Sequence, residues 1–163
     1  MKSSILLLAL TSSLFFFSCQ KEAGVIHDPI NTSSNNVPFM GDYVTTAVFL
    51  AGPSVQRITG VGTATHLGQN TFVANATVNF STPPPFAVQG TAVFTAANGD
   101  QFFTSFTGTS TPTGPGTSRG DFVHTITGGT GRFSDITGTL VGVAIVTVGS
   151  PTNTVSYQGT INF

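Results

Sequence analysis

Residues 71–80 alternate between apolar and polar side chains with a period of two. The apolar set is Phe72, Ala74, Ala76, Val78 and Phe80, and mostly polar residues stand between its members. Successive side chains of a β-strand point to opposite faces, so this pattern predicts a strand with one buried face. From Phe39 onward we find no stretch with the 3.6-residue period of an amphipathic helix.

Seven further extended runs are separated from this one by turn residues. Asn98 and Gly99 suit a tight hairpin, because both residues tolerate a positive φ angle. Residues 111–116 hold two prolines and two glycines, and we expect a long loop there. The sequence therefore predicts eight strands, at residues 42–50, 56–67, 71–80, 87–96, 101–110, 120–127, 136–148 and 154–163.

Gly–Thr pairs recur inside five of these predicted strands, at residues 62–63, 90–91, 108–109, 138–139 and 159–160. Glycine weakens a strand interior, but its recurrence from strand to strand fits places where a sheet coils sharply to close. Closure also removes exposed strand edges. We therefore predict an all-β fold, an eight-stranded antiparallel β-barrel, with an interior that holds side chains or one small ligand.

Charged residues make up only 7% of the chain, against about 25% in a typical soluble domain. A formal net charge of -1 argues against a nucleic-acid-binding protein, which needs a basic face.

The predicted seventh strand is apolar on both faces around residues 140–146. Two explanations for its outer face stay open: contact with another subunit, or cover by the N-terminal segment or a long loop.

The first residues have the pattern of a signal peptide. Lys2 precedes an uncharged, largely apolar run at residues 5–17, which is too short for a bilayer-spanning helix of about 20 residues. The run ends at Phe17, and the small residue Ser18 stands between it and Cys19, the only cysteine of the chain. A single cysteine excludes a disulfide within the chain, and it leaves no thiolate cluster for a metal.

The position of Cys19 resembles the lipobox of bacterial lipoproteins, in which the cysteine is acylated and becomes the first residue of the mature chain. Gln20, Lys21 and Glu22 resemble the export signal that sends lipoproteins of the Bacteroidota to the cell surface. The resemblance implies a membrane anchor at Cys19, attachment to the outer membrane and display at the surface. We expect a signal peptide at 1–18, a flexible tether at 19–38 and a barrel domain at 39–163.

Gly128, Gly129, Thr130, Gly131, Arg132 and Phe133 form a glycine-rich turn. Together with residues 62–68 and 94–100, this turn resembles that of the bacterial allene-oxide-cyclase-like and plant dirigent families. The resemblance implies an eight-stranded barrel and a homotrimer. The lumenal glutamate of the cyclases has no counterpart, since the only glutamate, Glu22, lies in the tether. We expect Phe133 to fold back as a plug at one end of the barrel.

Two histidines are candidate site residues. His66 is in phase with Ile58, and His124 is in phase with Phe122 and Ile126, so both are expected to face the lumen. There they would move a proton, or bind a metal or a ligand. Alternatively, each is a hydrogen-bonded wall residue or stands at a rim in water. Two histidines without a nearby carboxylate do not make a catalytic zinc site.

Several other side chains complete the candidate site. Two phenylalanines of the predicted fifth strand, Phe102 and Phe106, are candidate ligand contacts. Charged residues at strand ends and turns would line one barrel mouth or stand in solvent; they are Asp100, Arg119, Asp121, Arg132 and Asp135. No cofactor or metal is predicted, and no Gly-x-Ser-x-Gly elbow or Ser/His/Asp order supports a hydrolase.

Three functions follow from these features. The first is a lipid-anchored envelope protein whose barrel binds a small apolar molecule without catalysis. The second is an isomerase or cyclase resembling allene oxide cyclase, which requires His66 or His124 in an open cavity. The third is a structural or adhesive surface module, which predicts a filled barrel with binding at its outer face or at the loop 111–118.

Overall fold

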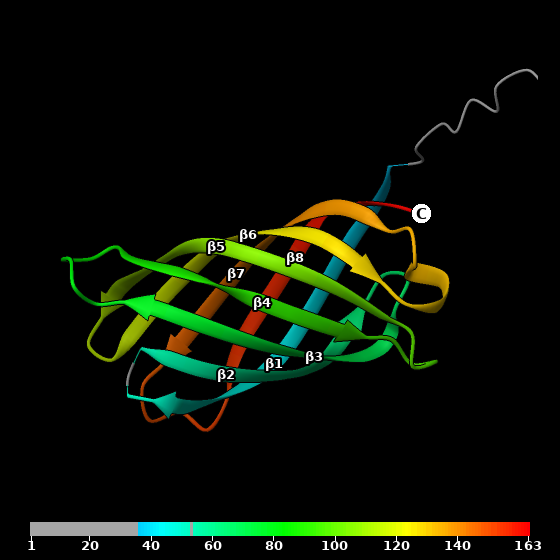
Figure 1. Cartoon of the computed structure of the whole chain (residues 1–163). Helices are drawn as coiled ribbons and strands as arrows, with labels where there is room; N and C mark the ends of the chain where they lie inside the picture. The colour runs from blue at the N-terminus through cyan, green and yellow to red at the C-terminus, as the bar shows by residue number, and fades with distance from the viewer. Residues whose placement is uncertain (1–35, 53) are drawn as a thin grey trace, which may run out of the picture. The chain divides into compact units, whose positions relative to one another are not determined.

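The computed structural model describes residues 36–52 and 54–163, and these residues form eight strands and one short 3-10 helix (Figure 1). Their bounds are β1 (Val37–Ala51), β2 (Val55–Ala64), β3 (Gly68–Asn79), β4 (Phe86–Thr95), β5 (Gln101–Gly114), β6 (Thr117–Gly129), η1 (Gly131–Phe133), β7 (Thr137–Thr147) and β8 (Asn153–Asn162). Within this described part, no helix is long and apolar enough to cross a membrane. The predicted signal peptide, Cys19 and most of the predicted tether lie outside the described residues.

Each strand pairs antiparallel with its neighbours in sequence, and β1 pairs with β8 to close the barrel. The prediction of a closed eight-stranded antiparallel barrel is therefore confirmed. Its hairpins alternate between two ends. The β1–β2, β3–β4, β5–β6 and β7–β8 hairpins lie at one end, which we call the cavity end. The other connections lie at the closed end, where the start of β1 meets the end of β8 (Figure 1).

Most strand boundaries differ from the prediction by one to five residues, and two of the differences change the predicted tether and loop. β1 begins at Val37, five residues before the predicted start, because Val37 and Pro38 pair with Ile161 and Thr160 of β8. The last two residues of the predicted tether are thus part of the barrel. The prediction of a long loop at 111–116 was wrong. The β5–β6 ladder continues to Gly114, with one irregularity in register, and a tight turn leads to Thr117.

Aromatic side chains fill the closed half of the lumen. Phe94 stacks on Phe102 with ring centroids 4.6 Å apart, and Tyr43 meets the edge of Phe72 at 5.0 Å. The Tyr43 hydroxyl donates a hydrogen bond of 2.7 Å to Asn70, which satisfies it away from water. Such aromatic pairs stabilise a core beyond the area that they bury. This half of the barrel is therefore a packed core without a site.

The glycine-rich turn plugs the closed end, as expected. Phe133 is fully buried and packs against Phe102, with ring centroids 5.8 Å apart. Gly131 has φ +57°, and the carboxylate of Asp100 occupies the place of the β-carbon that it lacks. The backbone N–H of Arg132 donates to the same carboxylate. Only glycine fits this position, because a side chain would be strained and would displace Asp100.

The outer face of β7 is uncovered in the described part of the chain. Val141 and Ile145 are exposed there, and Val123 of β6, the cross-strand partner of Val141, is exposed as well. No loop among the described residues therefore covers this face.

Candidate functional site

The lumen is hollow at the cavity end. All eight strands contribute side chains to a cavity of about 130 Å³. Its wall is mainly apolar, and the polar side chains around it come from Thr45, Gln56, Ser110, Ser118, His124, Asn153 and Tyr157. No Asp, Glu, Lys or Arg of the described residues lines it. The cavity is therefore suited to an uncharged, largely apolar molecule.

Small inward side chains explain why this half is hollow. Ala74 and Ala76 of β3 face the cavity, whereas Phe72 on the same face stands at its floor. Ala144 of β7 likewise faces the cavity, and Leu140, four residues earlier on the same face, fills the closed half. Along each of these strands, the inward-facing side chains are thus large in the closed half and small at the cavity end. The change leaves space that no side chain fills.

Two phenylalanines lie against the wall because glycines make room for their rings. A β-carbon at Gly90 would stand 2.6 Å from the ring of Phe106, and one at Gly120 would stand 2.4 Å from the ring of Phe122. Both distances are shorter than any real contact, so these rings occupy the space of the missing side chains. The rings contribute apolar surface to the cavity without crossing it. Inward-facing glycines thus shape the cavity as well as allowing the sheet to coil.

The floor of the cavity is formed by Phe72, His124 and Tyr157. The His124 and Tyr157 rings meet edge to face with centroids 5.1 Å apart. Burial raises the pKa of Tyr157, so its hydroxyl stays protonated at neutral pH. The phenol ring lies over Gly142, where a β-carbon would come within 2.7 Å of it.

His124 is the polar residue of the floor that is most shielded from water, with 1% of its surface exposed. Its Nδ1 lies 3.0 Å from the hydroxyl of Thr104, and its ring stacks on Phe106 with centroids 4.6 Å apart. Burial lowers the pKa of His124 to about 4, so the ring is neutral at pH 7. Its Nε2 has no hydrogen-bond partner in the described residues.

An unsatisfied polar atom of this kind costs about 1–3 kcal/mol. Nε2 has almost no accessible surface, so a ligand group reaches it only when the rings around it at the cavity floor shift. A neutral imidazole offers either a donor or an acceptor there, depending on its tautomer. A ligand hydroxyl satisfies both cases.

The prediction that His66 shares this lumen was wrong. β2 ends at Ala64, and His66 lies in the turn that follows, with φ +65°. The alternation of the strand does not continue through such a turn, so the side chain does not follow Ile58 inward. His66 is exposed at the closed end, where Nε2 lies 3.2 Å from the Pro38 carbonyl oxygen.

The charged candidates do not share one mouth. Arg119 and Asp121 face outward on β6, because they alternate with inward-facing Gly120 and Phe122. They form an exposed ion pair with a closest distance of 2.7 Å, which lowers the pKa of the Asp121 carboxyl. The other three lie at the opposite, closed end of the barrel; they are Asp100, Arg132 and Asp135. Arg119 and Asp121 are therefore not ligand contacts in the lumen.

The two phenylalanine candidates separate in the same way. Phe106 lines the cavity, whereas Phe102 is fully buried in the closed half. β5 starts at the closed end, so four residues of strand carry the chain from one half of the lumen to the other. Thr104, between them on the same face, was missed, although its phase with Phe102 and Phe106 already placed it inward.

Within residues 36–52 and 54–163, no three His, Cys, Asp or Glu side chains gather to hold a metal ion.

No family model matches the chain, and neither a curated protein nor a solved structure matches it. The resemblance of the glycine-rich turn to the allene-oxide-cyclase-like and dirigent families stays a prediction.

Proposed function

We propose that this chain is a lipid-anchored protein of the cell envelope whose barrel binds one small, uncharged apolar molecule. The observation that carries the proposal is the cavity of about 130 Å³ with an apolar wall and His124, whose buried Nε2 has no partner in the described residues, at its floor. The anchor rests on the sequence around Cys19, which lies outside the described residues.

The volume limits the ligand. An apolar cavity of about 150 Å³ holds a molecule of the size of benzene. The cavity here has about the same volume, so a single ring or a short branched chain fills it. A longer molecule would extend from the cavity end into solvent. An ionised ligand is disfavoured, because no charged side chain among the described residues lines the wall to balance its charge.

His124 adds one polar requirement. A ligand with a hydroxyl group at its inner end satisfies Nε2 once the floor rings shift to admit it, and Tyr157 forms part of the same floor. We therefore expect toluene to bind more weakly than benzyl alcohol, which has the same ring and one added hydroxyl. Satisfying a buried polar atom contributes about 1–3 kcal/mol, or roughly a tenfold difference in Kd or more.

The test is a titration of the purified chain with these two compounds, followed by NMR of the imidazole nitrogens of His124. Saturable binding with a shift of the Nε2 resonance supports the proposal. Ala144→Phe fills the cavity from β7 and should abolish binding, whereas Ala87→Phe places the same ring on the outer face of β4 as a control. Binding that survives Ala144→Phe, or no binding to the unchanged chain, would refute a lumenal site.

The anchor has its own test. Mass spectrometry of the mature chain should find acyl groups on Cys19, and Cys19→Ala should release the protein from the membrane fraction. A mature chain without acylation would refute the anchor and would leave the lumenal site unaffected.

The second candidate function is an isomerase. One observation favours it: His124 lines an open cavity, as that hypothesis requires. His124 and Tyr157 are the titratable groups around the cavity in the described residues. Turnover of a cavity-sized unsaturated compound that is lost in His124→Phe, while binding remains, would decide for this function.

A further inference from the structure

The four hairpins of the cavity end contain no ionisable side chain. They span residues 49–54, 80–86, 111–117 and 148–153, and consist of apolar residues, Gly, Pro, Ser, Thr and Asn. The connections at the closed end differ, since they include His66, Asp100, Arg132 and Asp135. The two ends of the barrel therefore differ in charge.

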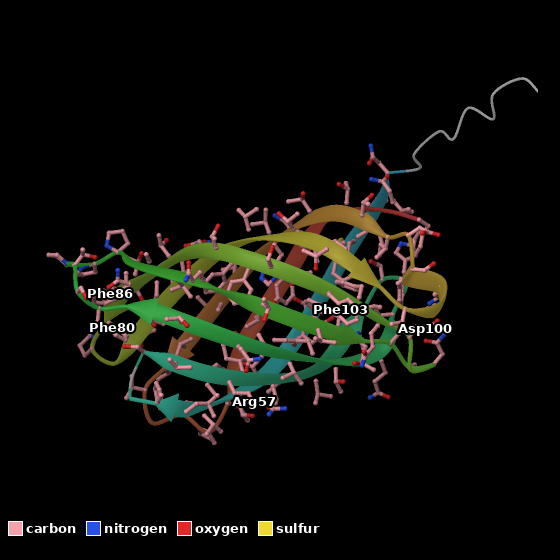
Figure 2. The ribbon with its side chains drawn as sticks, in the orientation of Figure 1. Arg57, Phe80, Phe86, Asp100 and Phe103 are labelled. Atoms are coloured by element: carbon pink, nitrogen blue, oxygen red, sulfur yellow. The ribbon has the colours of Figure 1, made fainter. Side chains whose placement is uncertain are left out.

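Large apolar side chains stand exposed on three of these four hairpins. Phe49 and Leu50 of β1–β2 are 61% and 57% exposed, Phe80 of β3–β4 is 46% exposed, and Val148 of β7–β8 is 80% exposed. Figure 2 shows Phe80 and Phe86 together at the cavity end and Asp100 at the opposite end. The Phe80 and Phe86 rings pack with centroids 4.9 Å apart. We call Phe49, Leu50, Phe80 and Val148 the apolar rim.

The rim continues into the cavity. Val146, two residues before Val148, lines the cavity and is itself exposed. An apolar surface thus runs from the hairpin tips to the apolar wall of the lumen. Hairpin tips normally carry polar residues that water solvates, so exposed apolar side chains on three neighbouring hairpins mark an interaction surface.

We propose that the cavity end docks on the surface of an uncharged lipid bilayer, with the apolar rim at the boundary between headgroups and acyl chains. The cavity then opens toward the acyl region, and a ligand enters it without crossing water. Docking on a bilayer goes beyond the function proposed above. The route of ligand entry rests on the ligand binding proposed there.

The chemistry of the surface favours a bilayer over a protein partner. Apolar side chains and uncharged hydroxyls suit the interfacial region of a bilayer, which needs no directional match. The first ionisable side chains back from these hairpins are Arg57 on β2 and the Arg119–Asp121 ion pair on β6. Charge therefore begins only behind the rim, where a docked barrel meets water and headgroups.

The length of chain before the barrel is compatible with this orientation. Residues 20–36 separate Cys19 from the start of β1 at the closed end. Seventeen residues reach at most about 60 Å. The 15 residues of β1 extend about 50 Å along the strand, and less along the tilted barrel axis. An anchor at Cys19 thus allows the cavity end to face the same membrane.

The experiment compares the two ends of the same chain. An NBD fluorophore is attached to Val148→Cys at the rim or, as a control, to Asn98→Cys at the closed end. Both are made in the mature chain of residues 19–163 with Cys19→Ser, so that the apolar run at residues 5–17 is absent. Each chain is added to phosphatidylcholine vesicles with brominated acyl chains. We expect quenching and a blue shift at position 148 and neither at position 98. Equal quenching at both positions, or quenching at position 98 alone, would overturn the proposal.

Two further measurements identify the partner. Leu50→Asp combined with Phe80→Asp should reduce quenching at position 148 on the order of tenfold, because the rim then resists the bilayer. Quenching should persist from about 0.1 M to about 1 M NaCl, since no ion pair is involved. A blue shift at position 148 without vesicles, with a doubled mass in solution, would assign the rim to a second copy and overturn docking on lipid.

The Ala144→Phe variant separates this proposal from the lumenal site. It fills the cavity but leaves the rim unchanged, so quenching at position 148 should equal that of the parent chain. Loss of ligand binding with retained quenching keeps docking and ligand binding as independent properties. Loss of quenching in this variant would show that the rim alone does not hold the bilayer, which contradicts the proposal.

Discussion

Acidification should destabilise this barrel through His124. The folded chain holds the imidazole neutral, since burial lowers its pKa to about 4. In the unfolded chain the same group has a pKa of about 6.5. As the pH falls below about 6.5, the unfolded chain gains a proton that the folded chain does not accept. The free energy of unfolding therefore decreases with falling pH, and the decrease ends near the folded pKa.

The size of the effect follows from the two pKa values. Each unit of difference corresponds to about 1.4 kcal/mol. At about pH 5 the loss is about 2 kcal/mol, and below pH 4 it approaches about 3 kcal/mol. With a urea dependence of about 1–3 kcal/mol per molar for a domain of this size, the unfolding midpoint should fall by roughly 1 M between pH 7 and pH 5.

The assay is urea unfolding of the parent chain and of His124→Gln at both pH values, followed by tyrosine fluorescence. Glutamine keeps a hydrogen-bonding group next to Thr104 but does not titrate. The difference between the two chains removes the contribution of every other ionisable group. If both chains lose the same stability between pH 7 and pH 5, the imidazole is already accessible to protons in the folded barrel, and the reasoning fails.

Three further substitutions test the fold. Phe133→Ala should lower the free energy of unfolding by about 3–5 kcal/mol in urea titrations, because it removes the fully buried plug of the closed end. Gly60→Ala should cost about 1–3 kcal/mol in the same assay, since its β-carbon would stand 2.2 Å from the Phe72 ring; a neutral result would mean that the ring moves freely. Arg119→Ala should leave the urea midpoint unchanged, because its ion pair with Asp121 is exposed.

Local patterns were sufficient for the strands but not for their ends. Alternation at residues 71–80 corresponds to β3, and the Asn98–Gly99 pair to the β4–β5 hairpin. The residues at 111–116 have the composition of a loop, yet most of them continue the β5–β6 ladder. Whether a stretch of Thr, Pro and Gly pairs with a neighbour depends on that neighbour, which short-range composition does not contain.

Of the two candidate histidines, the sequence placed one correctly and the other wrongly, again because of where a strand ends. His124 follows the alternation of a strand that continues past it, so its inward direction was predictable from Phe122 and Ile126. His66 stands just beyond the end of β2, and a turn with positive φ ends the alternation there. A phase count is valid only within a strand, and the sequence did not reveal that β2 ends at Ala64.

The amino-acid sequence by itself determined that this chain forms a closed antiparallel barrel, because side-chain alternation, turn residues and recurrent glycines are local properties of the chain. Only the tertiary structure decided that one half of the lumen is packed and the other hollow. That division depends on which inward-facing side chains of different strands meet at the same level of the barrel. Their level is set by strand register, which is a property of the assembled sheet.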